Sequence, residues 1–229
     1  RRRYCRCCGW HHYHRLMTKN LGLYIHIPFC VRKCAYCDFY SLTGCDAKFF
    51  DRYLKAMVKQ LDDYLLGGRK IKVDTIYIGG GTPSVFGAKR LSILIKEIKK
   101  RFDLTRDIEI TVEVNPESVD KKFFKTLKKA GVNRVSMGVQ SADDDQLSSL
   151  GRIHNFADAC EAVELCKKYC TENLSLDIPQ CLIDAGNGTH QDAAAAIEGS
   201  AVQLVPDPRL HKGAVQQIPQ GSRVLLLKQ

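Results

Sequence analysis

The sequence predicts an α/β protein: a partial (β/α) barrel with parallel strands and about five βα units, incomplete on its C-terminal side. Two observations predict this class. Short apolar runs alternate along the chain with amphipathic segments of ten or more residues, the pattern of βαβ units around a parallel sheet. Polar or glycine-rich residues follow the successive apolar runs, as in barrels whose functional groups lie at the C-terminal ends of the strands.

The expected elements follow one another from residue 21 onward. We expect strands at residues 23–27, 73–78, 108–114, 134–139 and 174–178. We expect helices at about 47–66, 88–101, 120–130, 143–150 and 155–169. Gly131 follows the lysine-rich helix 120–130, where a left-handed residue commonly ends a helix. After about residue 180 the pattern fades, apart from a candidate helix near 190–197.

This pattern divides the chain into three parts. Residues 1–16 contain five arginines and no acidic residue and have no periodicity, so we expect an unstructured basic extension before a natural start at Met17. Residues 17–180 form the core domain, and residues 181–229 form a weakly specified tail. The extension also offers an alternative, a metal site built from Cys5, Cys7, Cys8, His11, His12 and His14.

Charge and cysteine content narrow the class of protein. Half of the formal charge of +10 lies in the extension, and much of the rest follows helix faces, so nucleic acid is not the expected partner. No apolar stretch is long enough for a membrane span, and no signal peptide precedes the first strand. With 11 cysteines in such a chain, we expect a reducing, cytoplasmic location.

Three cysteines directly follow the first expected strand. Cys30, Cys34 and Cys37 have the spacing C-x-x-x-C-x-x-C, and no second pair with zinc-like spacing follows. Three thiolates on one loop suit a [4Fe–4S] cluster that keeps one iron open for a small molecule. Three buried cysteines in a turn are the simpler alternative.

The later strands also end in residues suited to a ligand. The second ends in Gly79, Gly80, Gly81 and Thr82, where missing side chains allow a close approach to the backbone. The third ends in Glu113, the fourth in Gln140 and the fifth in Asp177. Either carboxylate alone could cap a helix or loop, but together these groups indicate one ligand across the barrel mouth.

Five motifs then identify a family. They are Tyr-Ile-His-Ile-Pro-Phe-Cys-x-x-x-Cys-x-Tyr-Cys, Gly-Gly-Gly-Thr-Pro-Ser, Glu-Val-Asn-Pro-Glu, Ser-Met-Gly-Val-Gln-Ser and Leu-Gly-Arg-x-His. Their order over about residues 17–178 resembles radical S-adenosylmethionine proteins of the oxygen-independent coproporphyrinogen III oxidase group. Phe39 stands where the oxidases carry a further cysteine, so the chain is more similar to the branch of heme chaperones.

The resemblance implies roles for individual residues. Cys30, Cys34 and Cys37 would ligate the [4Fe–4S] cluster, whose open iron would bind S-adenosylmethionine. Reductive cleavage of that cofactor would yield methionine and a 5′-deoxyadenosyl radical. The remaining cofactor contacts would come from Tyr24, Tyr36, Gly80, Gly81, Thr82, Glu113, Gln140, Arg152 and Asp177.

The same resemblance predicts the biological setting and its alternatives. We expect a function in porphyrin or heme metabolism as a heme-chaperone-like protein, with flavodoxin or ferredoxin as electron donor and a heme-acceptor protein as a further partner. The alternatives are coproporphyrinogen oxidation and RNA modification. The loop expected after Asp177, a sixth strand and the family's accessory domain are not recognisable. This pattern suggests a truncated or frame-altered chain and argues against heme binding, because the heme-binding motif of related chaperones lies in that region.

Overall fold

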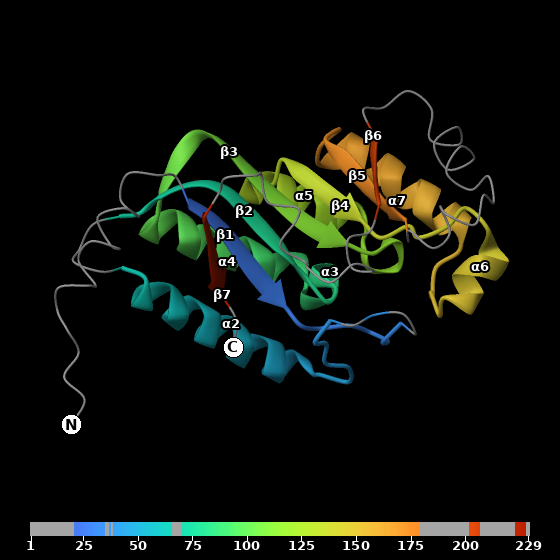
Figure 1. Ribbon diagram of the computed structural model, residues 1–229, viewed down its shortest axis with the longest axis horizontal. Coiled ribbons are helices and arrows are strands. Elements are labelled where there is room, and N and C mark those ends of the chain that lie inside the picture. The colour runs from blue at the N-terminus through green and yellow to red at the C-terminus, as the bar shows by residue number, and fades with distance from the viewer. Residues whose placement is uncertain are drawn as a thin grey trace.

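In the computed structural model, one parallel sheet organises the described part of the chain, which comprises residues 21–34, 37, 39–65 and 70–178 and the backbone of two further strands. The strand order is β6-β5-β4-β3-β2-β1-β7, as Figure 1 shows. The elements in chain order are β1 (Leu21–Ile27), α2 (Ala47–Asp63), β2 (Lys72–Gly80), α3 (Pro83–Phe86), α4 (Ala88–Arg101), β3 (Asp103–Val114), η2 (Pro116–Ser118), α5 (Lys121–Ala130), β4 (Arg134–Met137), α6 (Asp144–Ser149), α7 (Phe156–Tyr169), β5 (Leu174–Ile178), β6 (Val202–Pro206) and β7 (Arg223–Leu227).

The core lies between the sheet and a row of helices. Helix α2 packs on α4, α4 on α5, and α5 on α7, so these helices cover one side of the sheet (Figure 1). The strands contribute fully buried aliphatic side chains, among them Ile25, Ile78, Val112, Val135 and Leu176. Near-continuous apolar strands of this kind are typical of a parallel sheet. The prediction of a partial (β/α) barrel is therefore confirmed.

Local sequence signals explain where the helices begin and end. The Asp46, Asp120 and Asp143 carboxylates each accept a hydrogen bond from the backbone N–H three residues on, which caps α2, α5 and α6. Asn155 forms a reciprocal capping box with Asp158 at the start of α7. Gly131 has the predicted left-handed conformation, with φ 97° and ψ 17°, after the last turn of α5.

The boundaries differ from the prediction at four of the five strands. Strand β1 begins at Leu21 instead of residue 23, and β2 spans Lys72–Gly80 instead of residues 73–78. Strand β3 begins at Asp103 instead of residue 108, because the polar stretch 103–107 extends the strand where its side chains remain largely exposed. Strand β4 ends at Met137 instead of residue 139, because the backbone of residues 138–140 turns to bond side chains and the end of β5. The differences at β3 and β4 both involve polar residues, whose effect on strand boundaries cannot be predicted from hydrophobic periodicity.

The region 181–229 also contributes two strands that the sequence did not predict. Strand β6 pairs in parallel with β5, and β7 pairs in parallel with β1. A sixth strand was not recognisable in the sequence, whereas the structure has β6 beside β5. The candidate helix 190–197 and the extension 1–16 lie outside the described residues.

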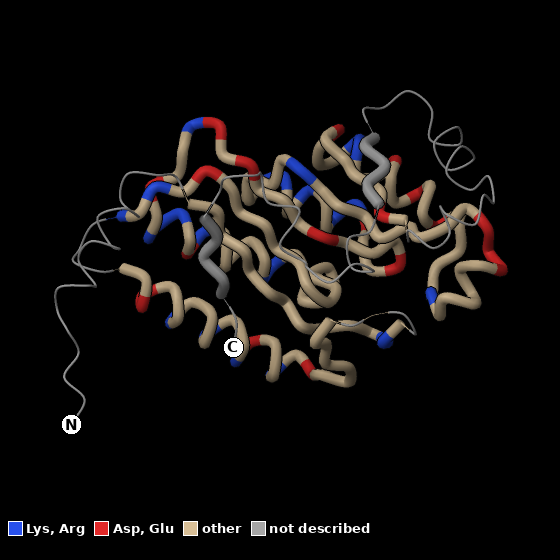
Figure 2. Tube along the Cα trace, viewed as in Figure 1, with Lys and Arg blue, Asp and Glu red and all other residues tan. Residues whose placement is uncertain are grey.

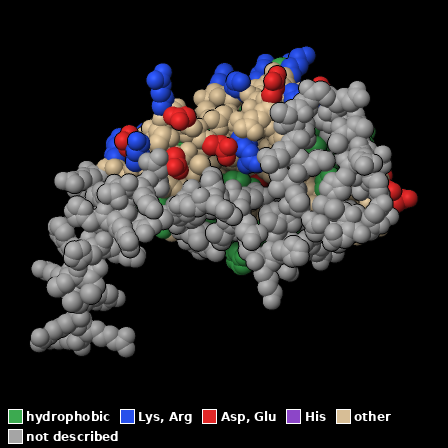
Figure 3. All heavy atoms as spheres, turned by 45° about the horizontal axis from the view of Figure 1, so that its top comes forward, with side chains coloured by type: hydrophobic (Ala, Val, Ile, Leu, Met, Phe, Trp, Pro, Cys, Tyr) green, Lys and Arg blue, Asp and Glu red, His purple; other side chains and the backbone are tan. Residues whose placement is uncertain are grey.

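Charged side chains are distributed over the surface in mixed sign. Figure 2 shows both basic and acidic residues along the described trace, although α5 carries five lysines and no acidic residue. On the face turned forward in Figure 3, basic and acidic side chains lie next to one another over the described residues. None of the helices in these residues has the length and apolar character needed to span a membrane.

Candidate functional site

The cysteine loop after β1 is closed by backbone hydrogen bonds at its base. Leu42 N donates to Pro28 O at 2.6 Å, and Cys30 N donates to Leu42 O at 3.0 Å. Within the loop, Cys37 N donates to Cys34 O at 3.2 Å. The loop therefore leaves the sheet and returns to it at one point, which holds the cysteines at the C-terminal end of β1.

Two of the three cysteine sulfurs contact polar groups from other strand ends. Thr82 Oγ1 lies 3.6 Å from Cys30 Sγ, and Arg152 Nη1 lies 3.6 Å from Cys34 Sγ. Burial raises the pKa of the Cys30 thiol; the hydrogen bond from Thr82 opposes this shift, and the neighbouring Cys37 and Cys34 add to it. All three cysteines are only partly buried.

A small cavity of about 40 Å³ joins these sulfurs to the glycine segment. Its lining includes predicted residues of both kinds, the cysteines of the cluster loop and the cofactor contacts after β2 and α6. They are Cys30, Cys34, Cys37, Gly80, Gly81, Thr82 and Arg152. The structure thus brings seven of the predicted site residues to one place, although they come from distant parts of the sequence.

The glycines after β2 allow two strand ends to approach closely. A Cβ on Gly81 would lie 2.8 Å from Phe29 O and 2.9 Å from Phe29 N. A Cβ on Gly80 would overlap the His26 ring, and Gly80 also has a positive φ of 118°. Both positions therefore require glycine because of the neighbouring chain, in addition to any need for space around a ligand.

Glu113 links β3 to β2 at the edge of this cavity. Gly80 N donates to Glu113 Oε2 at 2.9 Å, and Tyr77 Oη donates to Glu113 Oε1 at 2.7 Å. Tyr24 stacks on Tyr77, with ring centroids 6.0 Å apart, and its Oη lies 3.4 Å from His26 Nδ1. Tyr24 and Glu113 thus belong to one connected group. Tyr36 lies outside the described residues.

Gln140 is the predicted site residue with the most unpaired polar side-chain atoms among the described residues. Its side chain is completely buried, and neither its amide nitrogen nor its amide oxygen has a hydrogen-bond partner in the described chain. The residue has a positive φ of 73°, which costs about 1–3 kcal/mol for a side chain of this kind. A buried amide without hydrogen-bond partners, on a residue with a strained backbone, indicates a group that can form hydrogen bonds with a ligand.

Asp177 and Arg152 both lie next to Gln140. Gln140 N donates to Asp177 O at 2.9 Å, while the Asp177 carboxylate accepts from Ser136 Oγ. Arg152 Nη2 donates to Gly138 O at 2.7 Å, and its Nε is buried with no partner in the described residues. Gln140 and Arg152 therefore approach each other beside Gly138, where a Cβ would lie 3.0 Å from Gln140 Nε2 and 3.3 Å from Arg152 Nη2.

Sequence reasoning missed three residues in this region. Asn115 lines the small cavity, and its Nδ2 donates to Thr82 Oγ1 at 3.2 Å. Glu117 and His154 form a 3.0 Å contact near Arg152. All three residues lie within the five family motifs, which could have marked them as candidates. The spacing of residues in a motif does not, however, predict what each side chain contacts.

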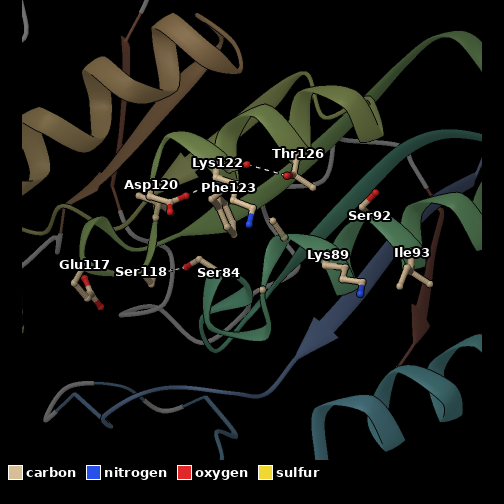
Figure 4. A pocket seen from close by; sticks show the side chains of 13 residues that line it. Ser84, Lys89, Ser92, Ile93, Glu117, Ser118, Asp120, Lys122, Phe123 and Thr126 are labelled. Carbon is tan, nitrogen blue, oxygen red and sulfur yellow. Dashed lines mark hydrogen bonds between the residues drawn. The ribbon is translucent and has the colours of Figure 1, made fainter. Parts of the chain in front are cut away.

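A larger groove of about 810 Å³ lies outside the cysteine cavity, between α4 and α5 (Figure 4). Lys89, Ser92 and Ile93 line its α4 side, whereas Asp120 and Lys122 line its α5 side. Glu117 stands at one end of this groove in Figure 4 and also lines a small pocket that contains Cys34 and Arg152. The groove contains none of the predicted site residues.

The remaining metal-binding expectations concern other cysteines and histidines. The described residues contain no three His, Cys, Asp or Glu side chains that converge on a single ion. A cubane cluster differs from a single ion because each thiolate binds a separate iron. Cys166 in α7 and Cys170 directly after it are buried in the core. The alternative site in residues 1–16 lies outside the described chain.

A parallel α/β sheet that carries a three-cysteine loop after β1 and polar groups after the next strands defines a radical S-adenosylmethionine protein. The chain belongs to the Radical SAM superfamily, whose family model matches residues 24–179. Membership of this family implies binding of a [4Fe–4S] cluster and S-adenosylmethionine.

Curated proteins similar to this chain are named as heme chaperones. The chain is 44% identical over 190 residues to the heme chaperone HemW of Haemophilus influenzae, a match that covers 81% of this chain and 49% of that protein. It is 40% identical over 164 residues to HemW of Escherichia coli, covering 72% and 43% of the two chains. The chain thus spans about half the length of the curated relatives it matches.

Solved structures support the fold. Coproporphyrinogen III oxidase (HemN) from Escherichia coli, described as a radical SAM enzyme, matches with a TM-score of 0.74 and 22% identity over 90% of this chain and 49% of that chain. The structure titled native anSMEcpe with bound AdoMet matches with a TM-score of 0.56 and 20% identity over 82% and 52%. At these identities the likeness concerns the fold alone.

Proposed function

We propose that Cys30, Cys34 and Cys37 bind a [4Fe–4S] cluster and that the neighbouring strand ends bind S-adenosylmethionine. The cavity shared by the cysteines, Gly80 and Arg152 carries this proposal, because family membership implies both groups and this cavity joins the two predicted residue sets. The proposed cofactor contacts are Tyr24, Tyr36, Gly80, Gly81, Thr82, Glu113, Gln140, Arg152 and Asp177.

The polar groups around the cavity fit such a ligand. The methionine end of S-adenosylmethionine carries both an amine and a carboxylate. The unpaired Gln140 amide and the unpaired Arg152 Nε could bond it, since an arginine fork suits a carboxylate. The carboxylate oxygens of Glu113, which already accept from Tyr77 and Gly80, could also accept from an amine or a ribose hydroxyl.

The protein's contribution to the chemistry is to bind, orient and exclude water. A cluster held by Cys30, Cys34 and Cys37 would, when reduced by an electron donor such as flavodoxin or ferredoxin, supply the electron for cleavage of S-adenosylmethionine into methionine and a 5′-deoxyadenosyl radical. Thr82 and Arg152 act on the cysteine sulfurs by hydrogen bonding, which adjusts their charge. The side chains of Ile27 and Phe29, directly before the cysteine loop, are completely buried.

Anaerobic cluster reconstitution tests this proposal. We expect the reconstituted chain to bind close to four irons and the spectrum of its reduced cluster to change when S-adenosylmethionine is added. Cys34→Ser should lose the cluster, whereas Cys160→Ser, a partly buried cysteine on α7, should retain it. A chain that forms no cluster, or one indifferent to S-adenosylmethionine, would refute the site.

We further propose that the chain functions in porphyrin or heme metabolism as a heme-chaperone-like protein. The similarity to proteins named HemW supports this choice, and Phe39 in place of a further cysteine favours it over the oxidase. Coproporphyrinogen oxidation remains the second candidate because HemN has the same fold.

Anaerobic incubation with coproporphyrinogen III separates these two functions. The reduced, reconstituted chain should release 5′-deoxyadenosine without converting coproporphyrinogen III to protoporphyrinogen IX. A Phe39→Cys variant is the control for the assignment to the heme-chaperone branch. This variant should also leave coproporphyrinogen III unchanged. Formation of protoporphyrinogen by the unmodified chain would replace the chaperone proposal by the oxidase.

A further inference from the structure

His154 is a buried histidine that the proposed cofactor contacts do not include. Its side chain has no exposed surface and lies between two oxygen acceptors. Nδ1 is 3.0 Å from Glu117 Oε2, and Nε2 is 3.0 Å from Val139 O. Both ring nitrogens are therefore at hydrogen-bond distance from an oxygen, on opposite sides of the ring.

This geometry favours a charged ring. A neutral imidazole has one N–H, so it can donate to only one of two acceptors, whereas an imidazolium donates to both. The alternative is a protonated Glu117 that donates to Nδ1. Burial acts to raise the pKa of Glu117, but the hydrogen bond from His154 and the charge of Arg152 outweigh burial and hold it below the ordinary value. The ionised pair is thus favoured.

His154 and Arg152 fix adjacent groups of the segment 138–140, which we call the β4 loop. Arg152 bonds the carbonyl of Gly138 and His154 bonds the carbonyl of Val139. Asp177 O then accepts from the N–H of Gln140. Three successive residues of the β4 loop are therefore anchored, immediately around the left-handed Gln140 whose amide is buried without a partner.

We propose that His154 is a positioning residue: as an imidazolium paired with Glu117, it fixes the β4 loop and the neighbouring Arg152 so that Gln140 and Arg152 face the cofactor. Glu117 anchors the pair to η2 at the end of β3, so the ends of β3 and β4 are joined through one ring. The proposal rests on the proposed cofactor site but concerns residues outside it.

The charge of His154 can be measured without any cofactor. Side-chain ¹⁵N spectra of the full chain should show both ring nitrogens of His154 protonated at pH 7, with the signal assigned by its loss in His154→Gln. Glu117→Gln should return the ring to one protonated nitrogen. A neutral ring in the unmodified chain would overturn the proposal.

The positioning role requires a second readout on the reconstituted protein. His154→Ala should weaken S-adenosylmethionine binding about 10-fold to 100-fold, as is common for residues that orient ligands, while the iron content stays unchanged. His154→Gln, which keeps two N–H donors without the charge, should recover part of this affinity. Glu164→Gln, which removes an exposed partner of Lys167 on α7, is the matched control and should bind as the unmodified chain does.

The two proposals fail in different ways. If the unmodified chain does not bind S-adenosylmethionine, the cofactor site is wrong, while the ¹⁵N spectra still report on the ion pair. If the unmodified chain binds it and His154→Ala binds equally well, only the positioning role is wrong.

Discussion

At the scale of single residues, Glu113 connects the ends of two neighbouring strands. Its two carboxylate oxygens accept from different donors, the backbone of Gly80 and the hydroxyl of Tyr77. Tyr77 in turn supports the ring of Tyr24. A change at Glu113 should therefore affect both the stability of the sheet end and the cofactor site.

We expect Glu113→Gln to destabilise the chain by about 1–3 kcal/mol, because an amide presents one acceptor and one donor to two donors and leaves one of them unsatisfied. The measurement is urea unfolding of the cluster-free chain. Glu109→Gln, whose carboxylate is 45% exposed on the same strand, provides the control and should change stability little. Equal stability of the two variants would mean that the Tyr77 and Gly80 contacts contribute nothing measurable.

The Glu117 carboxylate predicts how stability depends on pH. Because the pKa of Glu117 is lower in the folded chain than its ordinary value of 4.5, its ionised form stabilises the fold above that pH, and the contribution disappears as the pH falls through the folded value. The difference in unfolding free energy between the unmodified chain and Glu117→Gln should thus shrink as the pH falls below 4.5 through the folded pKa. A difference that grows below pH 4.5 would contradict the direction of the shift.

At the scale of elements, the sequence predicted the five strands and five helices of the core because their periodicities are strong. It missed β6 and β7 because the region after Asp177 has no comparable pattern, and it missed α3 because a helix of 4 residues is too short to show periodicity. Only part of the site was predicted, for a related reason. Motifs identified Gln140 and Arg152, but His154 acquires its role only when the fold sets it between Glu117 and Val139.

Gly81 tests the contact between the glycine segment and the cysteine loop. Gly81→Ala should cost about 1–3 kcal/mol and reduce cluster incorporation, because its Cβ would meet the backbone of Phe29, which cannot move aside as a side chain can. Gly44→Ala is the matched control: its φ is also positive, at 71°, but nothing lies within 4 Å of its Cβ. It should cost about 1 kcal/mol from the backbone alone and keep the cluster.

The start of α5 offers a prediction for a single helix. Asp120→Ala should reduce stability by about 1 kcal/mol, because the carboxylate accepts from Phe123 N at 2.6 Å and no other side chain caps this end. Thermal unfolding of Asp120→Ala and Asp120→Asn checks it, since asparagine also caps and should lose less. Equal losses would show that charge, and not capping, is what matters there.

At the scale of the whole molecule, charge is spread in mixed sign over the described surface, whereas the first 16 residues carry five arginines. Deleting residues 1–16 should abolish most non-specific binding of single-stranded RNA, because it removes half of the formal charge of +10. Filter binding at several salt concentrations gives the measurement. If the shortened chain still bound RNA equally well and with a strong dependence on salt, that result would favour an RNA-modifying function.

The pairing of β7 with β1 bears on the order in which the molecule assembles. Leu21 lies opposite Arg223, so β1 acquires this neighbour only after the intervening residues 28–222 have been synthesised. Until then, one edge of the strand that leads into the cysteine loop is open to pairing with another chain. Contacts of such long sequence separation form slowly, so cluster insertion into this loop is expected to follow synthesis and not to accompany it.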